Sequence, residues 1–472
     1  MPRRRAQLPG IFFAAAFATA ALGADPIVPE PLPDGQIPGF HFPESEATLT
    51  GWITSMTRGL PGAPAATARI QRHGWSLWTA LTAETAQTYE GQELRVFETW
   101  QTPEELAALT VAPASNPKAR PRAPLRTLQQ LRLRQGSSDT AAPVDDSNAI
   151  DRVMGFVKFD PTSAAHVLSQ RLLARATLDG LLDGGAQQVP VFPATTLVAK
   201  AVFQVITAND LVASRYYALK VWPGPPDSPQ TSMAAQWPGC VWIDVLGGGD
   251  GHGAIDYDAA PDGSSRTEAT TYPVASLMNY RLSAADAATT NQEKPGTAAA
   301  AGDYAILVAM HLAGREIARW TWHTFWWTPA ADEPPAPSSP AIASQRPAQL
   351  RGAARNYAMA LAYTMLTPDQ PYTGGENAGT PVYAYNPWVE ARLGPAELPD
   401  SLPGVDAHGG PTGNNFGVQT NCMSCHVRAT YNPNLRPTAP RFSGARYTDL
   451  GDPQFVGTLQ VDFLWSIARQ AQ

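Results

Sequence analysis

Cysteine is scarce in this 472-residue chain: there are three, and two of them lie three positions apart, at Cys422 and Cys425. So few cysteines exclude the dense disulfide framework with which small secreted domains replace a hydrophobic core. They also argue against a zinc ribbon, which needs a second pair of ligands, because only Cys240 remains. We expect Cys240, in the sequence WPGC, to be a buried free thiol; a disulfide to a partner or a reactive role is the alternative.

Charge is also low, because charged residues make up 16% of the chain, against the ~25% usual in globular proteins. The formal net charge is −7 and the chain has no basic cluster, so we expect no nucleic-acid partner. Proline is abundant, with 45 residues, and there are 13 Trp, 14 Tyr and 15 Phe. This composition and the length predict two or three packed, loop-rich domains rather than a disordered chain.

No apolar run reaches the ~20 residues that a membrane-spanning helix needs. The run at residues 11–22 follows three arginines at positions 3–5, and the Ala-Leu-Gly at 21–23 fits a small-x-small cleavage site. We therefore predict that residues 1–23 are a cleaved secretory signal, with an uncleaved anchor as the alternative. The mature protein would then be periplasmic, without a stable membrane span.

Composition divides the chain after the signal into four regions. The N-terminal region, residues 24–149, includes a Pro-rich linker, and residues 150–330 form a β-rich domain. Residues 331–404 are a Pro-rich linker followed by a helix, and residues 405–472 contain the cysteine pair. The predicted fold class is α+β, with a β-rich, sandwich-like central domain and a small, mainly helical C-terminal segment.

Local patterns predict the individual elements. The predicted helices cover residues 73–78, 163–175, 350–365 and 460–469. The predicted strands cover residues 95–100, 156–159, 197–206, 304–312 and 317–327. The last two strands flank a short polar turn and should form a hairpin.

The cysteine pair belongs to the sequence CMSCH at 422–426, which has the C-x-x-C-H spacing of covalent haem attachment. Cysteines three positions apart lie on the same side of a helical turn, so each sulfur can reach one vinyl group of a single porphyrin. His426 can then bind the iron as the proximal ligand. We predict one covalent haem c, held by Cys422, Cys425 and His426. A thioredoxin-type redox pair would need a βαβ context that the Pro- and Asn-rich flanks do not indicate.

A second iron ligand is missing downstream of the motif, because no Met follows Met423 and no His follows His426. The sixth ligand must therefore come from upstream, or the position is open. His408, in a Gly-rich loop, is the nearest candidate, with a solvated loop histidine as the alternative. The other upstream candidates, which we expect to pack in the core instead, are Met359, Met365, His311 and His323. Two strong ligands favour electron transfer, whereas a vacant position lets small molecules bind.

Four arginines surround the motif in sequence: Arg428, Arg436, Arg441 and Arg446. A guanidinium grips a carboxylate with two hydrogen bonds, so Arg428 and Arg446 are candidates to pair with the haem propionates. A solvated surface position is the alternative for each. Four aromatic residues are expected to wall the haem or to be ordinary core: Tyr447, Phe455, Phe463 and Trp465.

Segments across most of the chain resemble large bacterial proteins of the cytochrome c family that carry one C-x-x-C-H motif near the C-terminus. The matching segments are HGWSLW (73–78), FETW (97–100), VAKA (198–201), RYY (215–217), AMH (309–311), WTWHTF (320–325), NPWVE (386–390), NCMSCH (421–426) and DFLWSI (462–467). We associate the W-x-W-x-T-F strand with a following acidic–His pair, but Trp326 and Trp327 stand there instead, so no role of that pair is carried over. The resemblance implies haem and export, and it supplies no reaction.

We therefore expect an exported monohaem c-type cytochrome that transfers electrons in the periplasm. Its partner would be a redox protein or a small-molecule donor or acceptor. The alternatives are a haem enzyme, peroxidase-like or oxidising a small molecule, and a haem-based sensor, both with an open distal site. The missing downstream Met motivates these alternatives, whereas the absence of an evident distal acid–base pair favours the electron carrier.

Overall fold

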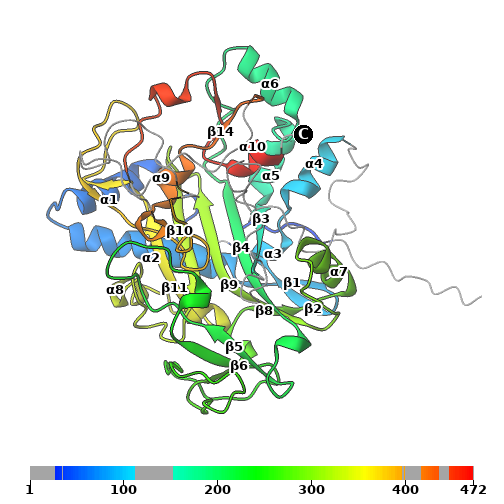
Figure 1. Ribbon diagram of the computed structural model, residues 1–472. Helices are drawn as coiled ribbons and strands as arrows, with labels where there is room; N and C mark the ends of the chain where they lie inside the picture. Colours follow the sequence, from blue (N-terminus) through cyan, green and yellow to red (C-terminus); the bar gives the residue numbers. More distant parts are fainter. Residues whose placement is uncertain are drawn as a thin grey trace, which may run out of the picture.

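The computed structural model describes residues 27–33, 36–111, 153–395, 398, 416–434 and 446–470. Its centre is an antiparallel six-stranded sheet of order β11-β10-β9-β4-β3, with β8 also paired to β9 (Figure 1). The strands of this sheet are β3 Val153–Phe159, β4 Leu197–Ile206, β8 Asn279–Arg281, β9 Tyr304–Gly314, β10 Thr321–Trp327 and β11 Tyr357–Ala362. Together with the helices around it, the sheet confirms the α+β class.

Helices and short strands surround the central sheet. The helices are α1 Glu46–Thr57, α2 Ala63–Leu81, α3 Val96–Thr99, α4 Pro103–Val111, α5 Pro161–Ser169, α6 Arg175–Asp183, α7 Ala284–Glu293, α8 Pro340–Ala343, α9 Cys422–His426 and α10 Trp465–Gln470. The remaining strands are β1 Glu84–Tyr89, β2 Gln92–Arg95, β5 Tyr216–Lys220, β6 Cys240–Asp244, β7 Thr271–Pro273, β12 Leu366–Thr367, β13 Thr380–Pro381, β14 Thr430–Tyr431 and β15 Leu459–Gln460.

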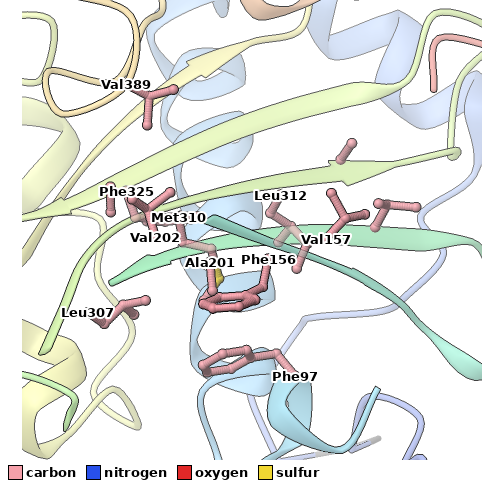
Figure 2. Packing of buried hydrophobic residues seen from close by; sticks show 14 of the residues in the cluster. Phe97, Phe156, Val157, Ala201, Val202, Leu307, Met310, Leu312, Phe325 and Val389 are labelled. Atoms are coloured by element: carbon pink, nitrogen blue, oxygen red, sulfur yellow. The ribbon is translucent and has the colours of Figure 1, made fainter. Parts of the chain in front are cut away.

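One face of the sheet is packed with large side chains against α2. A row of paired residues crosses it from β3 to β11: Phe156, Ala201, Met310, Phe325 and Met359. The Phe325 ring stacks on Trp78 of α2 with 4.1 Å between ring centroids. Figure 2 shows this packing, with Phe97 and Phe156 among the buried aromatic residues.

The opposite face carries smaller and polar residues. The neighbouring row contains Val157, Lys200, His311, Thr324 and Ala360. The C-terminal segment covers this face, because α9 packs against β10. Since side chains alternate along each strand, the two rows separate an aromatic core from a less filled side. That less filled side is where the C-x-x-C-H motif lies.

Several predicted elements are confirmed. Strand β4 has the predicted bounds, β9 and β10 form the predicted hairpin, and residues 73–78 lie within α2. The predicted helix at 163–175 overlaps α5, which ends at Ser169, and α6 starts only at Arg175, where the predicted range ends. The C-terminal helix starts only at Trp465. Cys240 is a buried free thiol as expected, and burial raises its pKa to about 11.

Two predictions of secondary structure are wrong. Residues 350–365 are not a helix but a short 3-10 turn followed by β11, because pairing with β10 outweighs the helix propensity of the alanines. Residues 95–100 are not one strand, because β2 ends at Arg95 and Val96–Thr99 form the helical turn α3. The Glu98 carboxylate accepts the Arg95 amide N–H at 2.8 Å and so fixes this helical turn.

The sheet also draws on more of the chain than residues 150–330. Its edge strand β11 comes from the region predicted as linker and helix, and α2 from the N-terminal region packs on it. The predicted signal at 1–23, most of the first Pro-rich linker and His408 lie outside the described residues.

Candidate haem site

Asn421 fixes the start of the motif helix α9. Its side-chain oxygen accepts the amide N–H groups of Met423 (2.9 Å) and Ser424 (3.2 Å), as a helix cap does. Its side-chain nitrogen donates to the carbonyls of Thr364 (3.1 Å) and Val382 (2.7 Å). Because Asn421 is fully buried, these four bonds tie α9 to the chain that follows β11.

Cys422, Cys425 and His426 line one cavity, which encloses about 1200 Å³ of empty space including its opening to solvent. Cofactor pockets are mostly apolar. The small-residue face of the sheet forms the floor, with Val157, Val198 and Ala313. The walls come from α10 and from a loop that contributes Val389, Leu393 and Leu398. The lining of the cavity is therefore mainly apolar, as in sites that bind apolar cofactors.

The His426 ring is oriented by a backbone carbonyl. Its Nδ1 donates to the carbonyl oxygen of Phe463 at 2.8 Å, so Nε2 keeps its lone pair. The ring also packs on Trp322 of β10 with 4.2 Å between centroids. Burial lowers the pKa of His426 to about 3, so the imidazole is neutral, as a metal ligand must be. Metal-binding histidines commonly donate their second nitrogen in this way.

The carbonyl that holds His426 belongs to a strained turn. Asp462 and Phe463 have φ angles of 45° and 68°, in the left-handed region that costs non-glycine residues roughly 1–3 kcal/mol each. The buried Asp462 carboxylate anchors the turn by accepting four hydrogen bonds. Its donors are the Phe192 amide (3.0 Å), Arg315 Nε (3.2 Å), Trp320 Nε1 (3.3 Å) and Gln188 Nε2 (3.4 Å).

The two motif cysteines are protonated thiols. Burial is the main reason that the pKa of Cys425 rises to about 12, and it raises the pKa of Cys422 as well. Reactive redox cysteines need the opposite shift, because the thiolate is the active form. In the described part of the chain, no group of three His, Cys, Asp or Glu side chains is arranged to bind a metal ion by itself.

A polar group, which we call the distal cluster, occupies the cavity on the β9 and β4 side: Lys200, His311 and Glu390. His311 Nε2 lies 3.3 Å from Glu390 Oε1. Burial opposes ionisation of Glu390, but His311, the Asn386 amide and Lys200 together lower its pKa. Burial lowers the pKa of Lys200 to about 8, with Glu390 acting in the opposite direction.

Two members of the distal cluster, Lys200 and Glu390, were not predicted as site residues. The sequence signal was present, because Lys200 interrupts an apolar strand and Glu390 closes the segment NPWVE. Strand register, which the sequence does not reveal, brings Lys200 opposite His311. His311 itself was expected to be a core histidine, and it lines the cavity.

The other predicted candidates lie away from the cavity. Arg428 is buried near the motif but does not line it, and Arg446 meets α9 through its backbone, whose carbonyl accepts the Ser424 hydroxyl at 2.8 Å. Arg469 of α10 lines the cavity instead. Met359 and His323 point to the opposite face of the sheet, where both lie against Gly74 of α2.

Met365 and most of the predicted aromatic wall also lie away from the cavity. Met365 is buried and does not line the cavity. Of the four aromatic residues expected around the haem, Trp465 lines the cavity, whereas the others, Tyr447, Phe455 and Phe463, are core. Arg436, Arg441 and His408 lie outside the described residues.

No protein-family model matches the chain, and neither does any curated protein or solved structure. Among the described residues, no helix is both long enough and apolar enough to cross a membrane.

Proposed function

We propose that the chain is an exported c-type cytochrome that carries one haem, bound through Cys422 and Cys425, and transfers electrons in the periplasm. One observation carries this proposal. Both thiols and His426 line the same apolar cavity, and the Phe463 carbonyl takes His426 Nδ1, which leaves Nε2 for iron. When bound, a c-type haem supplies an iron that gains and loses one electron.

The cavity residues would hold this group through two covalent bonds and through non-covalent contacts. Each thiol would add across one vinyl double bond, with the sulfur bonding to one carbon and the thiol hydrogen going to the other. The protonated, buried state of both thiols supports a structural rather than a redox role. Trp322 supports the proximal imidazole from the sheet side. Arg469 is the cation that lines the cavity from α10, and it suits a propionate carboxylate. A redox protein or a small-molecule donor or acceptor would exchange the electron.

The distal cluster supports a second candidate, a haem enzyme or sensor with an open distal position. A histidine hydrogen-bonded to a carboxylate can accept and return protons, as general acid–base catalysis requires. The His311–Glu390 pair comes close to this arrangement: the nitrogen and oxygen lie 3.3 Å apart inside the cavity, although they do not meet hydrogen-bond geometry. These two side chains are therefore candidates for the distal acid–base pair that is not evident in the sequence.

Covalent attachment is tested by producing the full chain in a host that exports proteins and matures c-type haem. Wild-type protein should keep its haem after denaturing electrophoresis and give the spectrum of a thioether-linked haem in alkaline pyridine. The double variant Cys422→Ala/Cys425→Ala should lose all covalent haem, because no sulfur then remains in the cavity.

Cys240→Ala is the matched control, because Cys240 is a buried thiol in β6 and does not line the cavity. This variant should keep as much covalent haem as wild type after denaturing electrophoresis. Wild-type protein without covalent haem, or a double variant that retains it, would show that the proposed function is wrong.

A further inference from the structure

His311 lies in β9, the strand next to β10, and β10 carries the Trp322 ring on which His426 packs. His426 rests on Trp322 of β10, and the residue paired with Trp322 on β9 is Ala313, two positions from His311. His311 and His426 also line the same cavity, and they are the two histidines among its described lining residues.

Glu390 is anchored to the sheet through Asn386 and lies beside His311. Its Oε2 accepts the Asn386 amide at 2.6 Å, and the Asn386 side chain donates to Thr324 Oγ1 and to the Phe325 carbonyl, both at 2.8 Å. Its other oxygen faces His311 Nε2. A ring nitrogen this close to a carboxylate oxygen is the one best placed to carry the proton, which leaves Nδ1 as the nitrogen that can bind a metal.

We propose that His311 is the sixth ligand of the haem iron and that Glu390 positions it, so the distal cluster completes a six-coordinate electron-transfer site. This inference rests on the proposed function. A carboxylate behind a coordinating imidazole fixes the tautomer and strengthens the ligand. The same arrangement occurs on the proximal side, where the Phe463 carbonyl plays this part for His426.

Lys200 is the competing donor in the cavity. It lies one strand further from Trp322 than His311 does, and no hydrogen bond or close ion pair reaches its nitrogen among the residues that the structure describes. Its contribution is electrostatic, because its charge offsets that of Glu390. We therefore assign ligation to His311 and charge balance to Lys200.

The test is the coordination state of the intact holoprotein. Wild-type ferric protein should be low-spin, with the near-infrared magnetic circular dichroism of two nitrogen ligands from histidine, and the ferrous form should not bind carbon monoxide. His311→Ala should become high-spin and bind carbon monoxide, and added imidazole should restore the low-spin spectrum. His311→Met, which keeps a ligand and covers the case in which the Ala variant misfolds, should stay low-spin and raise the reduction potential.

Three further variants test the named alternatives and the role of Glu390. Lys200→Met and His408→Ala should both remain low-spin with two histidine ligands; a high-spin spectrum in either would overturn the assignment. Glu390→Gln should keep the ligand but raise the reduction potential, because it removes a negative charge beside the iron. An unchanged potential in this variant would overturn the positioning role of Glu390.

The failure of this inference is distinguishable from that of the proposed function. Covalent haem in a high-spin protein that binds carbon monoxide would overturn only the His311 assignment and would favour the enzyme or sensor. Absence of covalent haem would overturn the proposed function itself.

Discussion

Asp462 sets the direction in which the proximal histidine points. Its carboxylate holds a turn of two residues with left-handed backbone, and the second of them, Phe463, supplies the carbonyl for His426. Removing a buried, paired carboxylate costs roughly 3–5 kcal/mol, because the partners are left without an acceptor. We expect Asp462→Ala to lower the free energy of unfolding of the holoprotein by about this amount, measured in urea.

A matched control for this prediction is Asp227→Ala, which changes an exposed loop aspartate and should alter stability by less than about 0.5 kcal/mol. If Asp462→Ala were as stable as the control, the strained turn would not depend on its carboxylate. Asp462→Asn is a milder test, because the amide keeps one accepting oxygen and should fall between the two.

At this scale the sequence predicts residues whose chemistry depends on local spacing. Cys422, Cys425 and His426 are recognisable because the three act within a single helical turn. The pairings of Asp462 with Arg315 and of Glu390 with His311 are not, because the partners lie far apart in sequence. Arg315 is 147 positions from Asp462, for example. Only the folded chain brings such pairs together.

The loop that walls the cavity is fixed by its contact with the 3-10 turn Gly417–Gln419, which precedes the motif. The Gly417 amide donates to the Leu393 carbonyl at 2.9 Å, and a Cβ at Gly417 would overlap the carbonyl of Glu390. Gly417→Ala must therefore push the two segments apart. We expect it to lower the free energy of unfolding by about 1–3 kcal/mol, as overpacking does.

Gly180→Ala serves as the control, because Gly180 lies in α6 and a Cβ there meets nothing within 4 Å. Alanine should stabilise that helix by roughly 0.5–1 kcal/mol. Denaturant unfolding of both variants measures the contrast. Equal stability of Gly417→Ala and wild type would mean that the wall of the cavity is not packed as described.

Prediction of the elements succeeded where the local pattern and the tertiary environment agree. Strand β4 is rich in β-branched and aromatic residues and lies in the middle of the sheet, and its bounds are those predicted. Strand β11 has alanine at alternate positions, 358, 360 and 362, which locally favours a helix. It forms a strand because its backbone pairs with β10, and this pairing between distant segments cannot be read from the local sequence.

Taken as a whole, the molecule places two buried polar groups on opposite faces of one sheet. The cavity with the distal cluster lies on one face, and on the other His73, Glu316, Tyr363 and His323 form a closed network against α2. Tyr363 links the two histidines, with its oxygen 2.6 Å from His73 Nδ1 and 2.8 Å from His323 Nε2. His73 Nε2 lies 3.1 Å from the Glu316 carboxylate. This second network couples the N-terminal region to the sheet.

That network should make the stability of the whole protein depend on pH. Burial, and then the neighbouring His73, lowers the pKa of His323 to about 3, against ~6.5 in an unfolded chain. Between these two values the unfolded state binds a proton that the folded state does not, so stability decreases as the pH falls. The loss from this group between pH 7.5 and pH 5 is about 2 kcal/mol.

Replacing His323 with Gln isolates this contribution. Glutamine does not titrate and can still bond to Tyr363, so the free energy of unfolding of His323→Gln should fall by about 2 kcal/mol less than that of wild type over the same pH range. Urea titrations at pH 7.5, 6 and 5 give the slopes, so the comparison holds even if the variant is less stable at every pH. His252→Gln, at an exposed histidine, should keep the wild-type slope. Parallel slopes for His323→Gln and wild type would show that His323 is not the buried neutral group described here, and the acid sensitivity would then belong to the carboxylates.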